Sequence, residues 1–519
     1  MVAGMKYPIG IQTFEEIITG DYVYVDKTEL VYKLIDSGKY YFLSRPRRFG
    51  KSLLTTTLEA YFLGHKEFFR GLAMEHLEKD WTVHPVFHLD FSAESYEKEG
   101  VAEAVINKFL TENEVKYGKD DTETTFGLRM LGLITRAKEQ TDKKAVLLID
   151  EYDKPLTDTI GQPELQDRNR ALLQSIYGVM KRADSCIRFA FLTGVTRYGK
   201  LGIFSAANNP QDISMSNTYA TICGITEAEL HEHFDSETDI FANTLNINKE
   251  ELYKLLKRKY DGYHFSINSV DVYNPFSLFN ALSDKRIGNY WFGTGSPTYL
   301  AKMLKARNYD LTKFNGEINS TEEGIASFGN GDENITAALY QGGYLTIKGY
   351  DRDTCAYLLG FPNEEVAEGF VQYLVKEYSG KNIDEFDADF IQLRRYVQAD
   401  NADAFMQQMQ LIISQIPFES NEPKLIEANF RNMLYLMIRS TGRNVSIEHP
   451  VLGGRIDVLF ETKDCAYIIE CKRDQSATEA LAQIDQKRYA EKIGSNKRIV
   501  KIGACFSTAE RNLTEWIVE

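Results

Sequence analysis

The chain has 519 residues, of which 43% are hydrophobic and 26% charged, and its formal net charge is −15. This length predicts two or three domains with ample core, and the composition is that of an ordinary globular protein. The acidity argues against polyanion binding by the whole chain. Residues 421–519, however, carry 15 Lys+Arg and 14 Asp+Glu, or about +1, which permits a nucleic-acid partner there without requiring one.

The sequence also argues against membrane proteins, secreted proteins and proteins held together by zinc or disulfides. No apolar run approaches the roughly 18–20 residues that span a bilayer, and the first eight residues lack the apolar core of a signal peptide. The six cysteines are scattered without a C-x-x-C pair, which argues against a zinc site or a disulfide framework. We therefore expect a cytoplasmic protein with no membrane partner.

The segment from Arg45 to Ser52, Arg-Pro-Arg-Arg-Phe-Gly-Lys-Ser, follows a short apolar run and opens a helical one. In this context, backbone N–H groups and the helix dipole bind phosphate. We expect Lys51 to reach the terminal phosphates of ATP and Ser52 to ligate Mg²⁺. The consensus opens with Gly where this chain has Arg45, so the match is imperfect. The residues expected to bind nucleotide here are Arg48, Phe49, Gly50, Lys51 and Ser52.

A second segment, Lys144 to Asp153, is a continuous apolar run that ends in acids. Such runs are typical of parallel strands buried on both faces, and ligands bind outside the carboxyl ends of these strands. Asp150 is therefore expected to hold Mg²⁺, and Glu151 to polarise the attacking water. The alternative is a buried strand whose polar end simply meets solvent.

Two more core strands are predicted in residues 1–220, which alternate strand and helix as an α/β ATPase core should. They cover 85–91 and 188–194. Thr193 or Thr196, at the end of the second, is a candidate sensor of the γ-phosphate, although either could instead cap the strand end. Upstream, Asp26 or Thr28 is expected to cap a helix rather than to contact nucleotide.

From about residue 221 to 300 the pattern turns helical. Helices are predicted over 227–234 and 249–260, followed by aromatic-rich turns, so this part is interpreted as a small helical lid. Residues 301–420 are predicted to be a mainly helical linking region, with a strand over 339–347 that turns at Gly342-Gly343.

Residues 421–519 predict a last α/β domain. Its elements are a helix over 423–440, strands over 444–448, 455–460 and 466–472, a helix over 477–492 and a strand over 498–506. A hairpin turning at Lys463-Asp464 pairs residues whose numbers sum to 927, which puts Asp457 opposite Glu470. Lys472 shares that face, whereas Cys471 is expected to point into the core.

Two opposed carboxylates repel each other unless a positive charge lies nearby. Either Lys472 supplies that charge in a surface acid–base cluster, or Asp457 and Glu470 hold a divalent cation. Mg²⁺ binds through one or two carboxylates plus substrate phosphate and can activate water, with Lys472 positioning that water or the scissile phosphate. The neighbouring helices offer three supporting side chains: Glu427 as a further acid, and Gln483 and Tyr489 to steady the site.

Ten motifs along the chain belong together: Tyr24-Val25-Asp26-Lys27-Thr28, residues 45–52, 149–153 and 193–196, Phe204-Ser205, Asn208-Asn209, Tyr260-Asp261-Gly262-Tyr263, residues 454–457 and 469–472, and Gln483 with Tyr489. Jointly they resemble a bacterial family, the AAA-ATPase-like proteins that carry a C-terminal PD-(D/E)XK nuclease domain. The resemblance covers almost the whole chain, and Arg45 in place of the first glycine is typical of that family.

The resemblance implies an α/β architecture: an AAA-like P-loop NTPase domain with a helical lid, joined to a restriction-endonuclease-like domain. It implies Asp457, Glu470 and Lys472 as the nuclease triad and Glu427 as the helix acid. We therefore expect an ATPase coupled to a Mg²⁺-dependent nuclease that acts on DNA rather than RNA. One alternative is a nucleotide switch whose nuclease-like domain binds nucleic acid or protein without cleaving. The other is a motor that assembles into a homo-oligomeric ring, for which Arg197 is a candidate arginine finger.

Overall fold

The computed structural model describes residues 5–198, 210–294, 298–315, 318–326, 334–379, 383–416 and 423–519. The chain divides into two compact units, each made of two pieces. The first unit is Met1–Trp291 with Asn319–Asn363, and the second is Phe292–Ile318 with Glu364–Glu519. The chain therefore passes between the units three times, and the predicted linking region 301–420 is shared between them.

A five-stranded sheet of order β2-β3-β4-β1-β5 forms the centre of the first unit, and all its paired strands are parallel. Its strands are β1 (Tyr40–Ser44), β2 (Val86–Asp90), β3 (Ala145–Asp150), β4 (Ile187–Gly194) and β5 (Gln211–Asp212). β3 is buried along its whole length, which is why it reads as an unbroken apolar run. The core strands predicted over 85–91 and 188–194 are confirmed.

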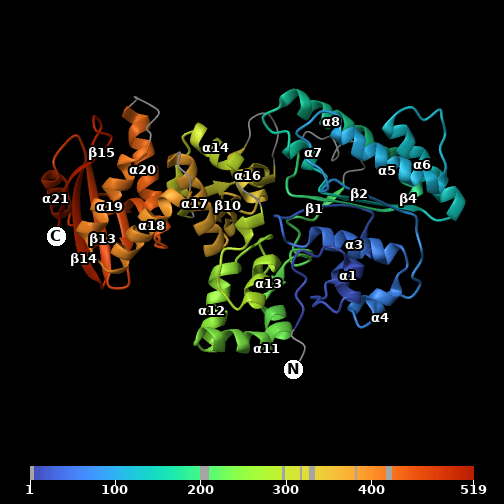
Figure 1. Ribbon diagram of the computed structural model, residues 1–519, viewed down its shortest axis with the longest axis horizontal. Coiled ribbons are helices and arrows are strands. Elements are labelled where there is room, and N and C mark those ends of the chain that lie inside the picture. Colours follow the sequence, from blue (N-terminus) through green and yellow to red (C-terminus); the bar gives the residue numbers. More distant parts are fainter. Residues whose placement is uncertain are drawn as a thin grey trace. The chain divides into compact units, whose positions relative to one another are not determined.

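Helices cover both faces of this sheet (Figure 1). α1 (Phe14–Thr19) and α3 (Lys51–Phe62) lie on one face. The other face carries α5 (Val101–Tyr117), α6 (Phe126–Thr141) and α8 (Pro163–Tyr177). Because α3 follows β1 directly, its N-terminus lies at the carboxyl end of the sheet, where ligands of such folds bind.

Asp26 or Thr28 was expected to be the N-cap of the helix that follows, but the N-cap is Lys27, and Asp26 lies one residue before it. The Asp26 carboxylate accepts a hydrogen bond from the Thr28 N–H (2.8 Å), at the start of α2 (Thr28–Ser37). The other carboxylate oxygen accepts from the Ala73 N–H (2.7 Å), at the start of α4 (Ala73–Leu77). Asp26 therefore joins the ends of two helices, satisfying N–H groups that helix starts leave unpaired.

The lid contains α11 (Glu227–Leu245), α12 (Lys249–Tyr260) and α13 (Pro275–Asp284), which share a cluster of buried apolar side chains. Capping boxes begin α11 and α12, formed by Thr226 with Glu229 and by Asn248 with Glu251. The helix over 249–260 is confirmed at both ends. α11 runs well past the predicted end at 234 and stops at Asn246, whose φ of +55° is left-handed.

The predicted strand over 339–347 is wrong at its start. Leu339 lies in α16 (Ile335–Gln341), which is capped by Asn334, and the strand β9 begins only at Thr346. A short apolar run is buried in either conformation, so its pattern alone does not separate helix from strand. Gly343 (φ +85°) ends the helix, and a Cβ at this position would lie 2.6 Å from the Cβ of Pro46. The end of α16 therefore packs against the phosphate loop.

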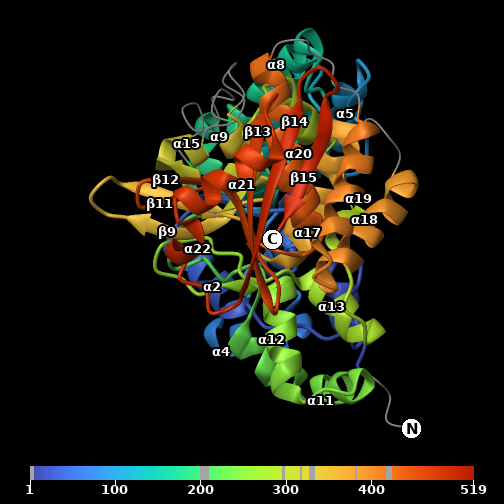
Figure 2. The ribbon, with the colours of Figure 1, turned by 90° about the vertical axis from the view of Figure 1, so that its left-hand side faces the viewer.

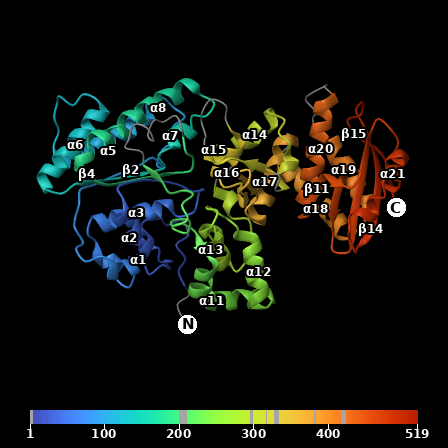
Figure 3. The same cartoon turned by 180° about the vertical axis from the view of Figure 1, so that it is seen from behind.

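The second unit begins its last part with α19 (Ala402–Ser414) and α20 (Pro423–Ser440) and continues into a five-stranded sheet of order β11-β12-β13-β14-β15. The strands are Val445–Val451, Gly454–Glu461, Cys465–Arg473, Arg498–Ser507 and Asn512–Val518. Only β13 and β14 pair in parallel. The sheet lies between α19 and α20 on one face and α21 (Ala477–Gln486) on the other (Figures 2 and 3).

Most predicted elements of this sheet are confirmed, with two differences. The last strand, β15, was not predicted. The helix predicted over 477–492 breaks into α21 and α22 (Tyr489–Lys492) at Arg488, whose φ is +53°. This break turns Tyr489 to the start of a new helix.

Replacing Gly343 with Ala tests the contact between α16 and the phosphate loop. Gly71→Ala is the matched control, because Gly71 also has a left-handed backbone (φ +80°) but no atom of the described residues within 4 Å of the added Cβ. Both variants carry the left-handed cost of about 1–2 kcal/mol. Gly343→Ala should lose a further ~1–3 kcal/mol from overpacking. Equal unfolding free energies of the two variants in denaturant titrations would contradict this packing.

Candidate functional site

The phosphate loop has an open front. Gly50 has φ +94° and precedes α3, and no heavy atom of the described residues lies within 4 Å of where its Cβ would be. Such a loop before a helix N-terminus presents N–H groups to an anion. Lys51 is buried, with its Nζ 3.4 Å from the Pro46 carbonyl oxygen and 3.3 Å from Glu151 Oε1. The loop therefore has the shape and charge for a phosphate group.

The two predicted Mg²⁺ ligands of this unit lie together. Asp150 ends β3, and its carboxylate is hydrogen-bonded to the Ser52 hydroxyl at the start of α3. Burial raises the pKa of Asp150 to about 6, against the lowering effects of Ser52 and Lys51. A hydroxyl and a buried carboxylate are the hard oxygen donors that Mg²⁺ prefers, so these residues fit the ion. Glu151 follows in a left-handed conformation (φ +48°).

The threonines considered as phosphate sensors both have partners within the protein. The Thr193 hydroxyl is buried and donates to the Leu43 carbonyl (2.9 Å) on β1. The Thr196 hydroxyl bonds to Asp153, which also accepts from the Thr196 backbone N–H (2.7 Å). Burial and the charge of Glu151 raise the pKa of Asp153. Asp153 was not singled out by the sequence, and it joins the ends of β3 and β4. A role for Thr193 in sensing phosphate stays a prediction.

Arg45 explains the departure from the phosphate-loop consensus. Its side chain is 1% exposed. Nη1 donates to the carbonyls of Ser44 (2.9 Å) and Ser214 (2.7 Å), and Nη2 donates to that of Tyr219 (3.3 Å). The guanidinium also stacks 4.0 Å from the Phe265 ring centroid. Burial lowers its pKa. The Arg45 side chain therefore clamps distant backbone to the back of the loop.

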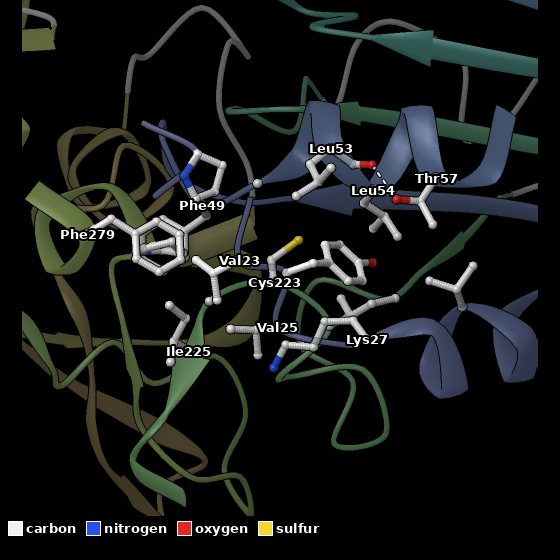
Figure 4. Close-up of a pocket in the computed structure, with 17 residues that line it drawn as sticks. Val23, Val25, Lys27, Phe49, Leu53, Leu54, Thr57, Cys223, Ile225 and Phe279 are labelled. Carbon is white, nitrogen blue, oxygen red and sulfur yellow. Dashed lines mark hydrogen bonds between the residues drawn. The ribbon is translucent and has the colours of Figure 1, made fainter. Parts of the chain in front are cut away.

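An apolar pocket of about 90 Å³ lies beside Phe49 and Gly50 (Figure 4). Its walls come from the N-terminal segment, the start of α3 and the lid, and include Val23, Val25, Leu53, Leu54, Ile225 and Phe279. Lys27 also lines the pocket and forms an ion pair with Glu229 of the lid (2.5 Å). A flat apolar group attached to the phosphates, such as a nucleobase, suits this position.

In the second unit the predicted hairpin register is confirmed. Val458 pairs with Ile469 and Glu461 with Ala466, so partner numbers sum to 927. The register brings Asp457 beside Glu470: the Asp457 backbone N–H bonds to the Glu470 carboxylate. One Asp457 carboxylate oxygen accepts from the Cys471 N–H (2.8 Å).

Glu470 is the most constrained acid of this site. Its side chain is 0% exposed, and its Oε2 has no hydrogen-bond partner among the described residues. Burial raises the pKa of Glu470 to about 8; the charge of Asp457 adds to the rise and that of Lys472 opposes it. A buried carboxylate oxygen without a partner, next to a second carboxylate, fits a divalent cation.

Lys472 is connected to Glu470 through one amide. Gln483 Nε2 on α21 donates to Glu470 Oε1 (2.9 Å), and Gln483 Oε1 accepts from Lys472 Nζ. Tyr489 Oη donates to the Arg455 carbonyl (2.6 Å). Gln483 and Tyr489 thus lie at the site, as predicted. Cys471 is half-buried rather than fully in the core.

Two predicted features cannot be placed. Glu427 belongs to α20, but its side chain lies outside the described residues, as do the motifs Phe204-Ser205 and Asn208-Asn209. Within the described residues, no group of three or more His, Cys, Asp and Glu side chains could hold a metal ion. Asp457 and Glu470 are a pair of carboxylates, and hard oxygen donors of this kind fit Mg²⁺, which often binds proteins through one or two carboxylates.

Comparison with known proteins identifies a domain family for each of the two segments that carry these residues. A family model described as "Predicted AAA-ATPase" matches residues 8–204, and one described as "PD-(D/E)XK nuclease superfamily" matches residues 425–516. A curated relative from Azotobacter chroococcum mcd 1 is 33% identical over 524 residues, which cover 99% of each chain; it is described as an uncharacterized protein in the vnfD 5' region.

The chain belongs to the AAA-ATPase-like proteins with a C-terminal PD-(D/E)XK nuclease domain. The phosphate loop and Asp150 lie in the first matched segment, and Asp457, Glu470 and Lys472 lie in the second. This AAA-ATPase-like protein is therefore nuclease-like and nucleotide-dependent by its domains. None of the helices in the described ranges combines the length and the apolar character needed to cross a membrane.

Arg45→Gly, which restores the phosphate-loop consensus, should weaken this ATPase-like domain rather than improve it. The change removes the Arg45 donor from the part-buried Ser214 carbonyl, at about 1–3 kcal/mol, and one of two donors from the Tyr219 carbonyl, which still accepts from the Ile222 N–H (3.2 Å). Arg45→Lys should be intermediate, because an ammonium cannot form the fork of bonds or stack as a guanidinium does. Thermal unfolding of the first unit is the measurement. A Tm of Arg45→Gly equal to that of wild type would refute the clamp.

Glu470→Gln should make the stability of the nuclease-like unit less dependent on pH. The pKa of Glu470 in the folded protein, about 8, lies above its ordinary value of 4.5. The folded state therefore holds a proton that the unfolded chain releases, and wild-type stability falls as pH rises from about 4.5 to 8. With a chelator present, the variant should have a higher Tm than wild type at pH 8.5, by about 2–4 °C for each kcal/mol of stability that wild type loses as the pH rises. Near pH 4.5 the two proteins should have the same Tm. The exposed Glu491→Gln is the control, and identical pH profiles for wild type and Glu470→Gln would count against the buried acid.

Proposed function

We propose that this protein is a Mg²⁺-dependent nuclease that cleaves DNA phosphodiesters under the control of ATP bound in its first unit. The observation that carries the proposal is the buried Glu470 beside the part-buried Asp457, with Lys472 connected to Glu470 through Gln483. Two acids and an amine in this arrangement match the needs of phosphodiester hydrolysis.

In the nucleotide-binding half, Lys51 and the N–H groups around Gly50 bind the phosphates of ATP. Ser52 and Asp150 hold its Mg²⁺, and Glu151 accepts the proton of the attacking water. The apolar pocket beside Phe49 receives the base. Bound ATP supplies a phosphoanhydride bond. Hydrolysis of this bond changes the contacts that the phosphate loop and the lid can make with the nucleotide.

In the nuclease half, Asp457 and Glu470 would hold Mg²⁺, which when bound activates water and stabilises charge on the phosphate. Lys472 positions that water or the scissile phosphate, and Gln483 orients both Glu470 and Lys472. A PD-(D/E)XK domain in which these three residue types are intact supports cleavage over binding alone. The nearly neutral charge of residues 421–519, against the acidity of the rest, is compatible with a polyanionic substrate.

Cleavage of plasmid, linear DNA and RNA with Mg²⁺, with and without ATP, tests the proposal. Asp457→Asn should lower the cleavage rate by about 100-fold or more, the scale on which charge-stabilising groups act. Lys51→Ala should abolish the effect of ATP while leaving the folded nuclease unit intact. The matched control is Asp464→Asn, an exposed acid in the turn of the same hairpin.

Each outcome decides a part of the proposal. If Lys51→Ala cleaves DNA with an unchanged response to ATP, the proposed control by nucleotide is contradicted. Cleavage by Asp457→Asn at the wild-type rate would place the chemistry elsewhere. If wild type cuts neither DNA nor RNA in any of these conditions, the switch that binds without cleaving takes the place of the nuclease.

A further inference from the structure

The tip of the β11–β12 hairpin presents an apolar side chain to solvent. Val451 pairs with Gly454, so Leu452 and Gly453 form a two-residue turn. Leu452 is 88% exposed, the highest value for a large apolar residue within the described residues. Isolated apolar residues are common on protein surfaces. This one differs because the backbone that carries it is held in place.

Three contacts brace the tip on α22. Lys492 Nζ donates to the Leu452 carbonyl (2.6 Å), and Tyr489 Oη donates to the Arg455 carbonyl (2.6 Å). A Cβ at Gly454 would lie 2.9 Å from the Tyr489 hydroxyl, so strand and helix are in close contact there. A side chain displayed on a braced turn loses little entropy when it enters a binding partner.

The same tyrosine connects the tip to the carboxylate pair. Tyr489 is hydrogen-bonded to Gln483, and after burial the charge of Glu470 contributes most to the rise of its pKa. Asp457 lies five residues after Leu452 in the chain and three residues after Gly454, where β12 begins. At about 3.3 Å per residue of extended chain the two are at most roughly 17 Å apart, because Leu452 lies in the turn. This distance corresponds to at most about five steps of duplex DNA at about 3.4 Å each.

The charged side chains around the hairpin tip indicate which class of partner Leu452 would bind. Arg455, whose side chain is 69% exposed, and the exposed Lys492, Lys487 and Arg488 lie on the elements next to Leu452. Arg455 also pairs with Glu448 (3.0 Å) and Arg488 with Glu491. A single apolar side chain among cations is too small for a protein interface, which needs a wider apolar centre. Cations around one apolar side chain suit a nucleic acid, whose phosphates are anionic and whose stacked bases are apolar.

We propose that Leu452 is a wedge that inserts between bases of the DNA substrate, within about five steps of the scissile phosphate, and unstacks them. This inference rests on the proposed nuclease function and adds a substrate preference to it. Because unstacking intact duplex is costly, the protein should favour DNA that is already unpaired or mismatched at that position.

Binding of duplex DNA labelled with 2-aminopurine tests the wedge without cleavage, in Asp457→Asn protein with Mg²⁺. In a series of duplexes labelled at successive positions, binding should raise the fluorescence of a label within about five steps of the cleavage position. Adding Leu452→Ala should abolish the rise and weaken duplex binding about 5- to 100-fold, the range found when a stacking side chain is removed. Leu452→Phe should retain both. Val115→Ala, which alters a residue of the first unit that is 86% exposed, is the control and should change neither.

Cleavage by otherwise wild-type protein gives a second measurement. Leu452→Ala should slow cutting of paired duplex and leave cutting of DNA with an unpaired stretch at the wedge position unchanged. Equal losses on both substrates, or no change in 2-aminopurine fluorescence on binding, would overturn the wedge while leaving the nuclease in place. If Asp457→Asn protein binds no DNA and wild type cuts none, both proposals fail.

Discussion

Both candidate sites depend on one constraint: an apolar strand carries a carboxylate to a place where water cannot solvate its charge. Asp150 ends β3 and Glu470 lies near the end of β13, and burial raises their pKa values to about 6 and about 8. A buried carboxylate is stable in its ionised form only beside a cation or hydrogen-bond donors. Ser52 supplies a donor in the first site and Gln483 in the second. This burial makes both carboxylates suitable ligands for a divalent cation.

The phosphate loop is shaped by parts of the chain that are distant in sequence. Arg45 holds the carbonyl of Ser214, Trp291 Nε1 donates to the Arg47 carbonyl (3.1 Å), and the turn at Gly343 packs on Pro46. These contacts cover the back of the loop and leave the front open. The consensus glycine is dispensable here because the arginine side chain provides contacts within the protein that a glycine would lack. These contacts hold the loop in shape from behind.

In the nuclease-like unit, rigid elements rather than loops hold the chemistry. Asp457 and Glu470 lie on paired strands, and Gln483 reaches them from α21. The break at Arg488 places Tyr489 where it contacts both the site and the strand that leads to the hairpin tip. Sites built on strands and helices keep their geometry better than sites on loops, because packing locks their side chains.

The sequence by itself determined the core strands of the first sheet over 85–91 and 188–194, the phosphate loop and the register that sets Asp457 beside Glu470, but not the last strand, β15. Buried parallel strands are continuous apolar runs, and the position of a tight turn sets which residues pair. It did not determine the conformation of 339–347, because a short apolar run packs equally well as helix or strand. Only the tertiary structure revealed the clamp by Arg45 and the exposure of Leu452. Arg45 binds backbone carbonyls, one of them 169 residues away. Because every residue carries a carbonyl, no sequence pattern marks these partners. The exposure of Leu452 likewise depends on which surfaces the rest of the fold leaves uncovered.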